Sequence, residues 1–348
     1  MSIRFDNFLD DDKMANLLRT ILPLLEVKRL YLNLTFRTFM GLSTLSENTF
    51  SDLMELELVL TLRQSEVNIN IHDPHHLMAR LRSVTLHNDG DDASQMDIWV
   101  DKLSPSLPWS QLRSIEIDDI PFLNLRLIVN ILRQIPMLQS LSLTIIRSHL
   151  NSSFSSLEDL TLPSLSDFSL YIGVEIALDE ILCSFTFPCL TKFTLGSGLA
   201  SCWTRKTFSI LAQQYNMQNL HEVRFSGGFA LTLSISSILR NAPMLRSLSV
   251  RWDTILDDQA ITGISDGTLG RCLQRLEIPA AIDLGEVLDI AIARKKKVDE
   301  MIKNGCSWKE DIALLKEIKF VRNFGSQKVC DDEKLRSLKD AGITVTYT

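Results

Sequence analysis

Two stretches of this chain, ILRQIPMLQSLSL (131–143) and ILRNAPMLRSLSV (238–250), agree at 9 of 13 positions although 107 residues separate them. Each reads as the end of a helix, a proline that stops the helix, and a strand in which apolar residues alternate with polar ones. Their final segments share the pattern L-x-x-L-x-L. A pattern that returns after so long an interval indicates a protein built from internal repeats.

The same pattern, with other apolar residues replacing some leucines, recurs ten times at steps of 25 to 31 residues. Its members are VKRLYL (27–32), LMELEL (53–58), LRSVTL (81–86), LRSIEI (112–117), LQSLSL (138–143), LSDFSL (165–170), LTKFTL (190–195), LHEVRF (220–225), LRSLSV (245–250) and LQRLEI (273–278). LEDLTL (157–162) also fits, but we interpret it as part of the connection into residue 165. The repeats account for the 57 leucines among 348 residues.

The spacing predicts the fold. In x-L-x-L the apolar residues face one side of a short strand, and the residues between them face the other side. The remaining residues of each unit return the chain to begin the next strand beside the last, which makes the strands parallel and the connections largely helical. We therefore expect an α/β leucine-rich-repeat solenoid, a horseshoe with a parallel sheet on its concave face and helices on its convex face.

Three regions follow from this pattern. Residues 1–26 are expected to form an N-terminal cap with a helix over 13–25, and residues 27–283 to form about ten repeat units. Residues 284–348 are expected to form atypical C-terminal repeats and a cap. Within the repeats we expect helices after Pro74, Pro121 and Thr207. Within the C-terminal region we expect a helix over 284–303, a strand over 314–320, a helix over 332–342 and a strand over 343–347.

Composition narrows the class of protein. The chain has 36 Lys and Arg against 43 Asp and Glu, a net charge of −7, which argues against a nucleic-acid binder. It contains no apolar run long enough to span a membrane, and no signal peptide opens it. None of the six cysteines lies in a C-x-x-C pair. We expect a monomer of the cytoplasm or nucleus.

Three short motifs resemble parts of functional sites, but each has a simpler structural interpretation. In GISDG (263–267) the Ser lies downstream of the last His, so the order of a hydrolase triad cannot be met, and we expect a surface turn. In IHDPHH (71–76) the adjacent His side chains diverge on a helix, so we expect a helix start and no metal site. RKKK (294–297) is interpreted as a solvated helix face. We expect no catalytic residue, cofactor or metal.

The polar residues of the strands remain, and they are expected on the concave face. Acidic residues dominate there between 55 and 118, whereas Arg224, Arg251 and Arg275 fall in three successive units and are expected to form a stripe. The stripe is predicted to dock an acidic protein segment, because the guanidinium fork binds carboxylates bidentately. The candidate protein-binding residues are Glu55, Glu57, Glu116, Asp118, Tyr171, Arg224, Arg251 and Arg275.

The repeat unit ILRNAPMLRSLSV, the segment LDIAIARKK (288–296) and the ending LRSLKDAGITVTYT (335–348) resemble the leucine-rich-repeat region of fungal F-box proteins, especially those of mushroom-forming fungi. The resemblance covers about 27–348. It implies a non-enzymatic receptor that recruits substrates to a cullin-type (SCF) ubiquitin ligase. The Leu-Pro-x-Glu opening of an F-box is not found before residue 27, so the F-box that binds the ligase adaptor would be either missing from this chain or supplied elsewhere.

A second class stays open beside this one. Leucine-rich-repeat proteins also act as regulators, and a GTPase activator or a scaffold that works without a ligase fits the same fold. A GTPase activator would need a catalytic Arg on a rim loop, and the sequence singles out no such residue. In both classes the partner is a protein that binds the concave face.

Overall fold

The computed structural model describes the chain in segments and divides it into two compact units. Unit 1 comprises Met1–Ile176 with Ser184–Phe187, and unit 2 comprises Ala177–Cys183 with Pro188–Thr348. The described residues are 1–6, 11–42, 45, 49–61, 78–88, 107–120, 125–145, 159–173, 182–197, 211–212, 215–227, 233–250, 254–279, 282–304, 312–321 and 332–347.

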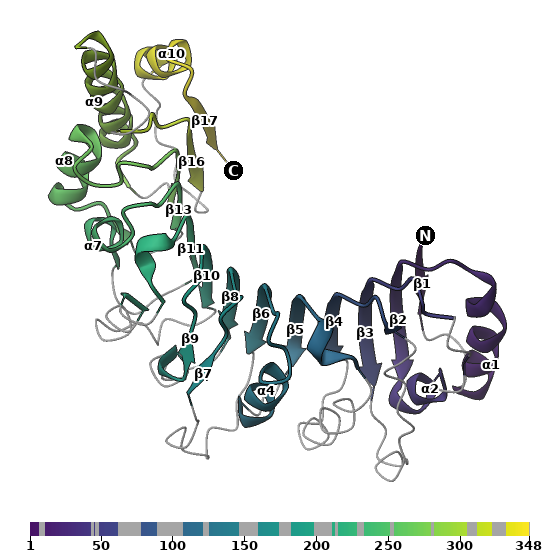
Figure 1. The fold of residues 1–348 in the computed structure, drawn as a ribbon. Coiled ribbons are helices and arrows are strands. Elements are labelled where there is room, and N and C mark those ends of the chain that lie inside the picture. Colours follow the sequence, from purple (N-terminus) through teal and green to yellow (C-terminus); the bar gives the residue numbers. More distant parts are fainter. Residues whose placement is uncertain are drawn as a thin grey trace. The chain divides into compact units, whose positions relative to one another are not determined.

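Unit 1 is a parallel sheet whose strands lie in chain order, with helices beside it (Figure 1). The sheet strands are β1 (Ser2–Phe5), β2 (Arg29–Thr35), β3 (Glu55–Thr61), β4 (Ser83–Asn88), β5 (Ser114–Ile120), β6 (Ser140–Ile145) and β8 (Asp167–Ile172). A second small sheet pairs β7 (Leu160–Thr161) with β9 (Phe185–Thr186). The helices are α1 (Asp11–Ile21), η1 (Leu22–Leu24), α2 (Phe36–Gly41), η7 (Trp109–Gln111) and α4 (Leu125–Leu132).

Unit 2 repeats this plan. Its parallel sheet contains β10 (Lys192–Ser197), β11 (Glu222–Gly227), β13 (Ser247–Val250), β15 (Arg275–Pro279), β16 (Glu317–Val321) and β17 (Thr344–Tyr347). A small sheet pairs β12 (Leu233–Ser234) with β14 (Thr254–Ile255). The helices are η9 (Met217–Asn219), α7 (Ile235–Asn241), α8 (Asp258–Asp266), α9 (Leu284–Lys303) and α10 (Asp332–Asp340).

The repeat pattern predicted these strands correctly. A strand of the main sheets begins at the third residue of each of the ten L-x-x-L-x-L segments. The apolar pair of each strand is buried while the residues between them are more exposed, as in the alternating burial of β6. The α/β class and the parallel order of neighbouring strands are thereby confirmed, and they are consistent with a leucine-rich-repeat solenoid.

The core of each unit is a pair of apolar ladders that run across the strands. In unit 1, Leu56 lies in register with Leu30 on one side and with Val84 on the other. In unit 2, Leu248 lies in register with Val223 and Leu276. All six side chains are buried. No strand can bury its own leucines alone, so the stacking of neighbouring units supplies the hydrophobic stabilisation.

A recurring backbone turn leads into the strands. The N–H of the first motif leucine donates to the carbonyl three residues earlier, over 2.9–3.3 Å, and the residue that supplies this carbonyl is buried. The turn occurs at Leu53, Leu81, Leu112, Leu138, Leu165, Leu220, Leu245 and Leu273. The turn fixes the start of each strand by a main-chain hydrogen bond. It does not depend on one side-chain type, so different residues occur at the position that supplies the carbonyl.

Several predicted details were also correct. The expected helix over 284–303 is α9, and the expected strand over 314–320 contains β16. The predicted helix over 332–342 is α10, followed by Gly342 at φ 76°. The described part of the helix expected after Pro121 is α4, Leu125–Leu132.

Other segments differ from expectation or cannot be compared. The expected 13–25 helix divides into α1 and η1, and LEDLTL contains the short strand β7. Strand β1 was not predicted, because its four residues lack the leucine pattern; it pairs with β2 in parallel. IHDPHH lies outside the described residues, as does most of the helix expected after Thr207.

The GISDG motif is not the surface turn that was expected. Gly263 and Ser265 lie inside α8, and the Ser265 hydroxyl donates to the Ile261 carbonyl over 2.7 Å. The helix ends at Gly267, whose φ of 80° is a left-handed conformation that glycine adopts without a Cβ clash. Asp257 caps the helix at its other end, so capping residues on both sides extended the helix through the motif.

Candidate functional site

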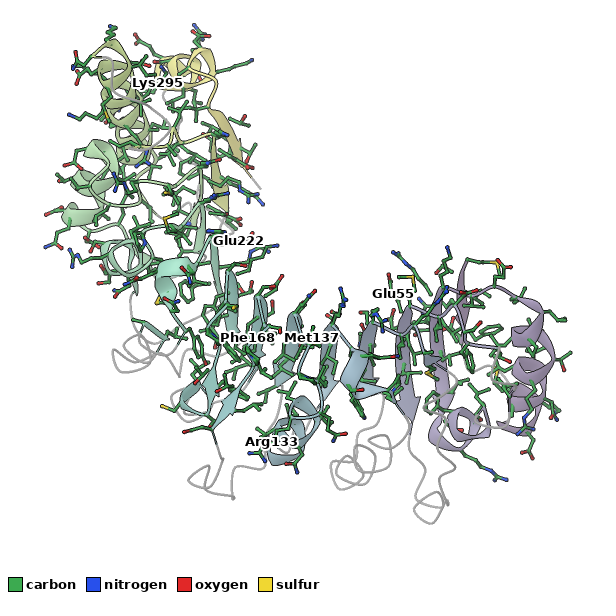
Figure 2. The ribbon with its side chains drawn as sticks, in the orientation of Figure 1. Glu55, Arg133, Met137, Phe168, Glu222 and Lys295 are labelled. Carbon is green, nitrogen blue, oxygen red and sulfur yellow. The ribbon has the colours of Figure 1, made fainter. Side chains whose placement is uncertain are left out.

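The polar residues of the strands form rows across the sheet face opposite the apolar ladders. Parallel register sets residues from successive strands beside one another, about 4.8 Å apart. One row in unit 1 contains Ser2, Arg29, Glu55, Ser83, Ser114, Ser140 and Asp167, and the next contains Arg4, Tyr31, Glu57, Thr85, Glu116, Ser142 and Ser169. In Figure 2, Glu55 lies on the opposite side of unit 1 from Arg133, which follows α4.

The charges at the start of unit 1 interact with one another. Arg29 forms an ion pair with Glu55 at 3.0 Å. The guanidinium of Arg4 lies 4.1 Å from the ring centroid of Tyr31 and also forms an ion pair with Asp6 at 3.1 Å. These exposed side chains gain little stability from such pairs, but the pairs set their positions on the face.

A histidine links two of the predicted acidic residues. Nε2 of His87 lies 3.2 Å from Glu57, and Nδ1 of the same ring lies 3.8 Å from Asp118. In the neighbouring row the Thr85 hydroxyl donates to Glu116 over 3.4 Å. Across the part of the chain that the structure describes, no three His, Cys, Asp or Glu side chains gather closely enough to hold a metal ion.

The structure thus brings four of the candidate residues together in unit 1. Glu55 and Glu57 lie on β3, while Glu116 and Asp118 lie on β5, and β4 separates the two strands. Tyr171 lies apart from them on β8 with 42% of its surface exposed. His87 was not among the predicted site residues; its alternation with Val84 and Leu86 in LRSVTLHN is the sequence signal that places it on this face.

The arginines of unit 2 do not form the straight stripe that stacking predicted. Arg224 on β11 is in register with Ser249 on β13, whereas Arg275 on β15 is in register with Ser247. The two arginines therefore lie in different rows, diagonally across β13. Arg251 lies outside the described residues. The number of residues between strands follows from the sequence, but the register between paired strands decides which residues are neighbours.

Each of the two described arginines of this face has a glutamate on the same strand. Glu222 precedes Arg224 by two residues and Glu277 follows Arg275 by two, so each arginine shares its strand face with a glutamate. Lys319 on β16 lies 3.8 Å from Glu277. Figure 2 shows Glu222 on the side of the unit 2 strands away from helices α7 and α8. The face is therefore a mixed-charge surface with diagonal arginines.

The predicted cationic run 294–297 is divided between core and solvent. Lys296 and Lys297 are exposed as expected, and Lys295 forms an ion pair with Asp299. Arg294 is fully buried, which contradicts the interpretation of the whole run as a solvated face. Arg294 occurs at helical spacing with Val287, Ile290, Ala291 and Val298, so the apolar stripe of α9 carries it into the core.

Backbone carbonyls surround the buried guanidinium. Arg294 donates to Ile264 near the end of α8, to Gly270 and Arg271 in the turn before β15, and to Ala313 before β16, over 2.8–3.0 Å. Removal from water lowers the pKa of Arg294 to about 10, although a nearby Cys272 acts in the opposite direction. The side chain thus joins α9 to three other segments, and its role is structural.

A cavity of about 570 Å³ lies among the helices of unit 2. Helices α8, α9 and α10 line it with side chains that include Ile261, Ile290 and Lys334. Lys334 forms an ion pair across the helices with Asp289 at 2.6 Å. Ser265 and the carboxylates of Asp283, Glu286 and Asp289 also line the cavity. The Ser265 hydroxyl donates to the Ile261 carbonyl, so the described contacts do not pair it with a base, and the cavity does not suggest a reaction.

Comparison with models of known protein families and with curated protein sequences gives no match to this chain. Among the described residues, no helix is both long and apolar enough to cross a bilayer. The fold and the polar sheet faces therefore carry the functional argument.

Proposed function

We propose that this protein is a recognition module that binds other proteins through the helix-free faces of its parallel sheets and performs no chemistry of its own. One observation supports the proposal most directly. The register sets exposed charged and aromatic residues from successive strands into rows, so that one partner can contact many repeat units at once. Such rows give specificity through charge complementarity.

The unit 1 face indicates a partner with basic residues. Glu57 and Glu116 lie in the same row, two strands apart, with Thr85 between them. Asp118 lies in the next row. Arg29 on the same face is already paired with Glu55. Acidic side chains therefore outnumber basic ones in the middle of this face.

A finer proposal concerns the assembly in which the module works. The resemblance to fungal F-box proteins supports a role as substrate receptor of a cullin-type ubiquitin ligase. In that role the sheet faces would hold the substrate, and an F-box joined to the repeat region or supplied by another protein would bind the ligase adaptor.

Affinity capture with matched variants tests the general proposal. The full chain is immobilised, and partners from native extract are compared for the unaltered protein and a Glu57→Lys/Glu116→Lys variant. An Asp258→Lys/Glu300→Lys variant, which makes the same charge change on the exposed helices α8 and α9, is the control. We expect the first variant to lose partners that the control retains. Equal capture by all three proteins would contradict recognition through the unit 1 face.

The same samples separate the finer proposal from the general one. Cullin and its adaptor should be present among the captured proteins if the ligase assignment is right. If proteins are captured through the sheet face but cullin and its adaptor are absent, the recognition function stands and the ligase assignment is wrong.

A further inference from the structure

A buried serine on the polar face of unit 2 has no hydrogen-bond partner. Ser249 lies in β13 between Leu248 and Val250, which both face the core, so its side chain faces the polar side of the sheet. Only 5% of the residue is exposed, and within the described part of the chain nothing bonds to its Oγ. A buried hydroxyl without a partner is costly, because it has lost its hydrogen bonds to water.

Ser249 lies between an arginine and a glutamate, because Glu277 is its register partner on β15, and a second arginine lies diagonal to it. Arg224 is its register partner on β11, and Arg275 lies on β15 opposite Ser247, two residues before Ser249. Strand spacing and residue rise place the two arginine Cα atoms about 12 Å apart, diagonally across β13. Both side chains are exposed. Because β13 carries only serines at these positions, the longer arginine side chains stand on either side of it.

Neither arginine is held by another side chain. Among the described residues, the side chains of Arg224 and Arg275 have no hydrogen bond or ion pair, although Arg275 is in register with Glu317 on β16. Reaching Ser249 requires neighbouring side chains to move, and both arginines can turn toward a ligand without breaking a described bond. This differs from Arg4 and Arg29 on the face of unit 1, which form ion pairs with Asp6 and Glu55.

The surrounding charge favours an anion. Lys192 is in register with Glu222, and Lys319 is in register with Glu277, so each glutamate that lies beside the patch has a lysine neighbour on its outer side. The basic residues on this face are Lys192, Arg224, Arg275 and Lys319, and the acidic ones are Glu222, Glu277 and Glu317. Basic residues therefore exceed acidic ones by one on the described part of this face, and Arg224 and Arg275 are the two cations whose side chains have no described partner.

We propose that Arg224, Ser249 and Arg275, here called the Arg–Ser–Arg patch, bind carboxylate side chains of an acidic segment in a protein partner. Each guanidinium donates two hydrogen bonds to one carboxylate in a bidentate pair. The Ser249 hydroxyl donates to a carboxylate oxygen and thereby gains the partner that it lacks. The inference rests on the proposed recognition function and assigns a partner chemistry to the unit 2 face.

Fluorescence anisotropy with the full chain tests the patch. The probe is a labelled synthetic peptide of alternating Glu and Ser, and the matched peptide has Gln in place of Glu. We expect binding of the Glu peptide alone, weaker at high salt because exposed charges are screened. Arg224→Gln and Arg275→Gln should each weaken binding about tenfold, as expected for loss of a charge-assisted pair.

Ser249→Ala separates binding from a structural role. Removing a hydroxyl that has no partner should leave the thermal unfolding midpoint of the free protein unchanged or higher, while affinity for the Glu peptide falls about threefold. A residue that only fills space would change neither affinity nor its salt dependence. Arg336→Gln, an exposed arginine on α10, is the control and should change binding less than twofold.

Several outcomes would overturn the inference. Loss of binding in Arg336→Gln equal to that in Arg224→Gln would show unspecific attraction of charges. Binding of a peptide with phosphoserine but not of the Glu peptide would assign the patch to another ligand, and self-association abolished by Arg275→Gln would assign it to a second copy. If no peptide binds while partners are still captured through the unit 1 face, the recognition module stands and the patch does not.

Discussion

The two units share the same arrangement of strands and helices, but they differ in whether the arginines on their sheet faces have acidic partners. In unit 1 the strand-face cations have partners on the same face, such as Glu55 for Arg29. In unit 2, Arg224 and Arg275 have none among the described residues, and Arg294 is buried against carbonyls. The repeat constrains only the inward residues of each strand. Outward residues are free to diverge, and there the two units acquire different surfaces.

Arg294→Met should produce the largest change and should confine it to unit 2. The variant leaves the carbonyls of Ile264, Gly270 and Ala313 without their donor, so we expect unit 2 to lose about 4 kcal/mol of stability. Hydrogen exchange of the β15 and β16 amides measures the loss. Lys295→Met, which removes a half-exposed neighbour on the same helix, should cost about 0.5 kcal/mol. Similar losses in both variants would contradict a structural role specific to Arg294.

Leu141→Ala and Leu248→Ala compare the cores at matched positions of the internal repeat. Both side chains are buried in their ladders. Each truncation should cost about 3 kcal/mol, the transfer energy plus a cavity, and should act in its own unit. Urea unfolding with exchange readouts from β6 and β13 checks this. Losses that differ several-fold would show that the shared backbone plan does not give the units equivalent cores.

Asp257→Ala tests a junction that unit 2 builds from two helix caps. Asp257 accepts from the Ala260 N–H at 3.0 Å, capping α8, and from the hydroxyl of Ser234, which caps α7. Burial alone would raise the pKa of Asp257, but hydrogen bonds from Ser234, Ser236 and Ala260 outweigh it and lower the pKa. We expect a loss of about 1–2 kcal/mol at neutral pH.

The pH dependence of that loss has a defined sign. A carboxyl with a lowered folded pKa stabilises the protein above its unfolded pKa, about 3.9, and this contribution disappears as pH falls through the folded value. The difference between Asp257→Ala and the unaltered protein should therefore shrink in acid. Asp258→Ala, next in sequence and exposed, is the control. A difference that stays constant down to acid pH would argue against the ionised cap.

Arg29→Gln and Arg224→Gln should give the smallest effects on stability. Arg29 loses an exposed ion pair with Glu55, worth at most about 0.5 kcal/mol, whereas Arg224 loses none. Chemical denaturation should therefore show a slight loss for the first variant and no measurable loss for the second. A clear destabilisation by Arg224→Gln would mean that the side chain has a structural partner in the folded protein.

The candidate site shows where prediction from sequence reached its limit. Alternation in LMELEL and LRSIEI placed Glu55, Glu57 and Glu116 on the polar face correctly, because strand geometry forces successive side chains to opposite sides. The arginine stripe was wrong in its register. Arg224 is the fifth residue of LHEVRF and Arg275 the third of LQRLEI, so the two side chains share a face but lie in different rows. Spacing between units alone was used for the stripe, and it does not take this offset of two residues into account.

The L-x-x-L-x-L repeat by itself determined the parallel order of the strands and the composition of the two core ladders. Leucines at every second position face the same side of a strand, and they are buried by the strands that stack on either side. Only the tertiary structure decided what the polar residues do. It placed Arg294 beside carbonyls from three separate segments, and it left the Ser249 hydroxyl buried between Arg224 and Glu277 without a hydrogen-bond partner among the described residues. Those contacts join residues distant in sequence, and local periodicity carries no information about them.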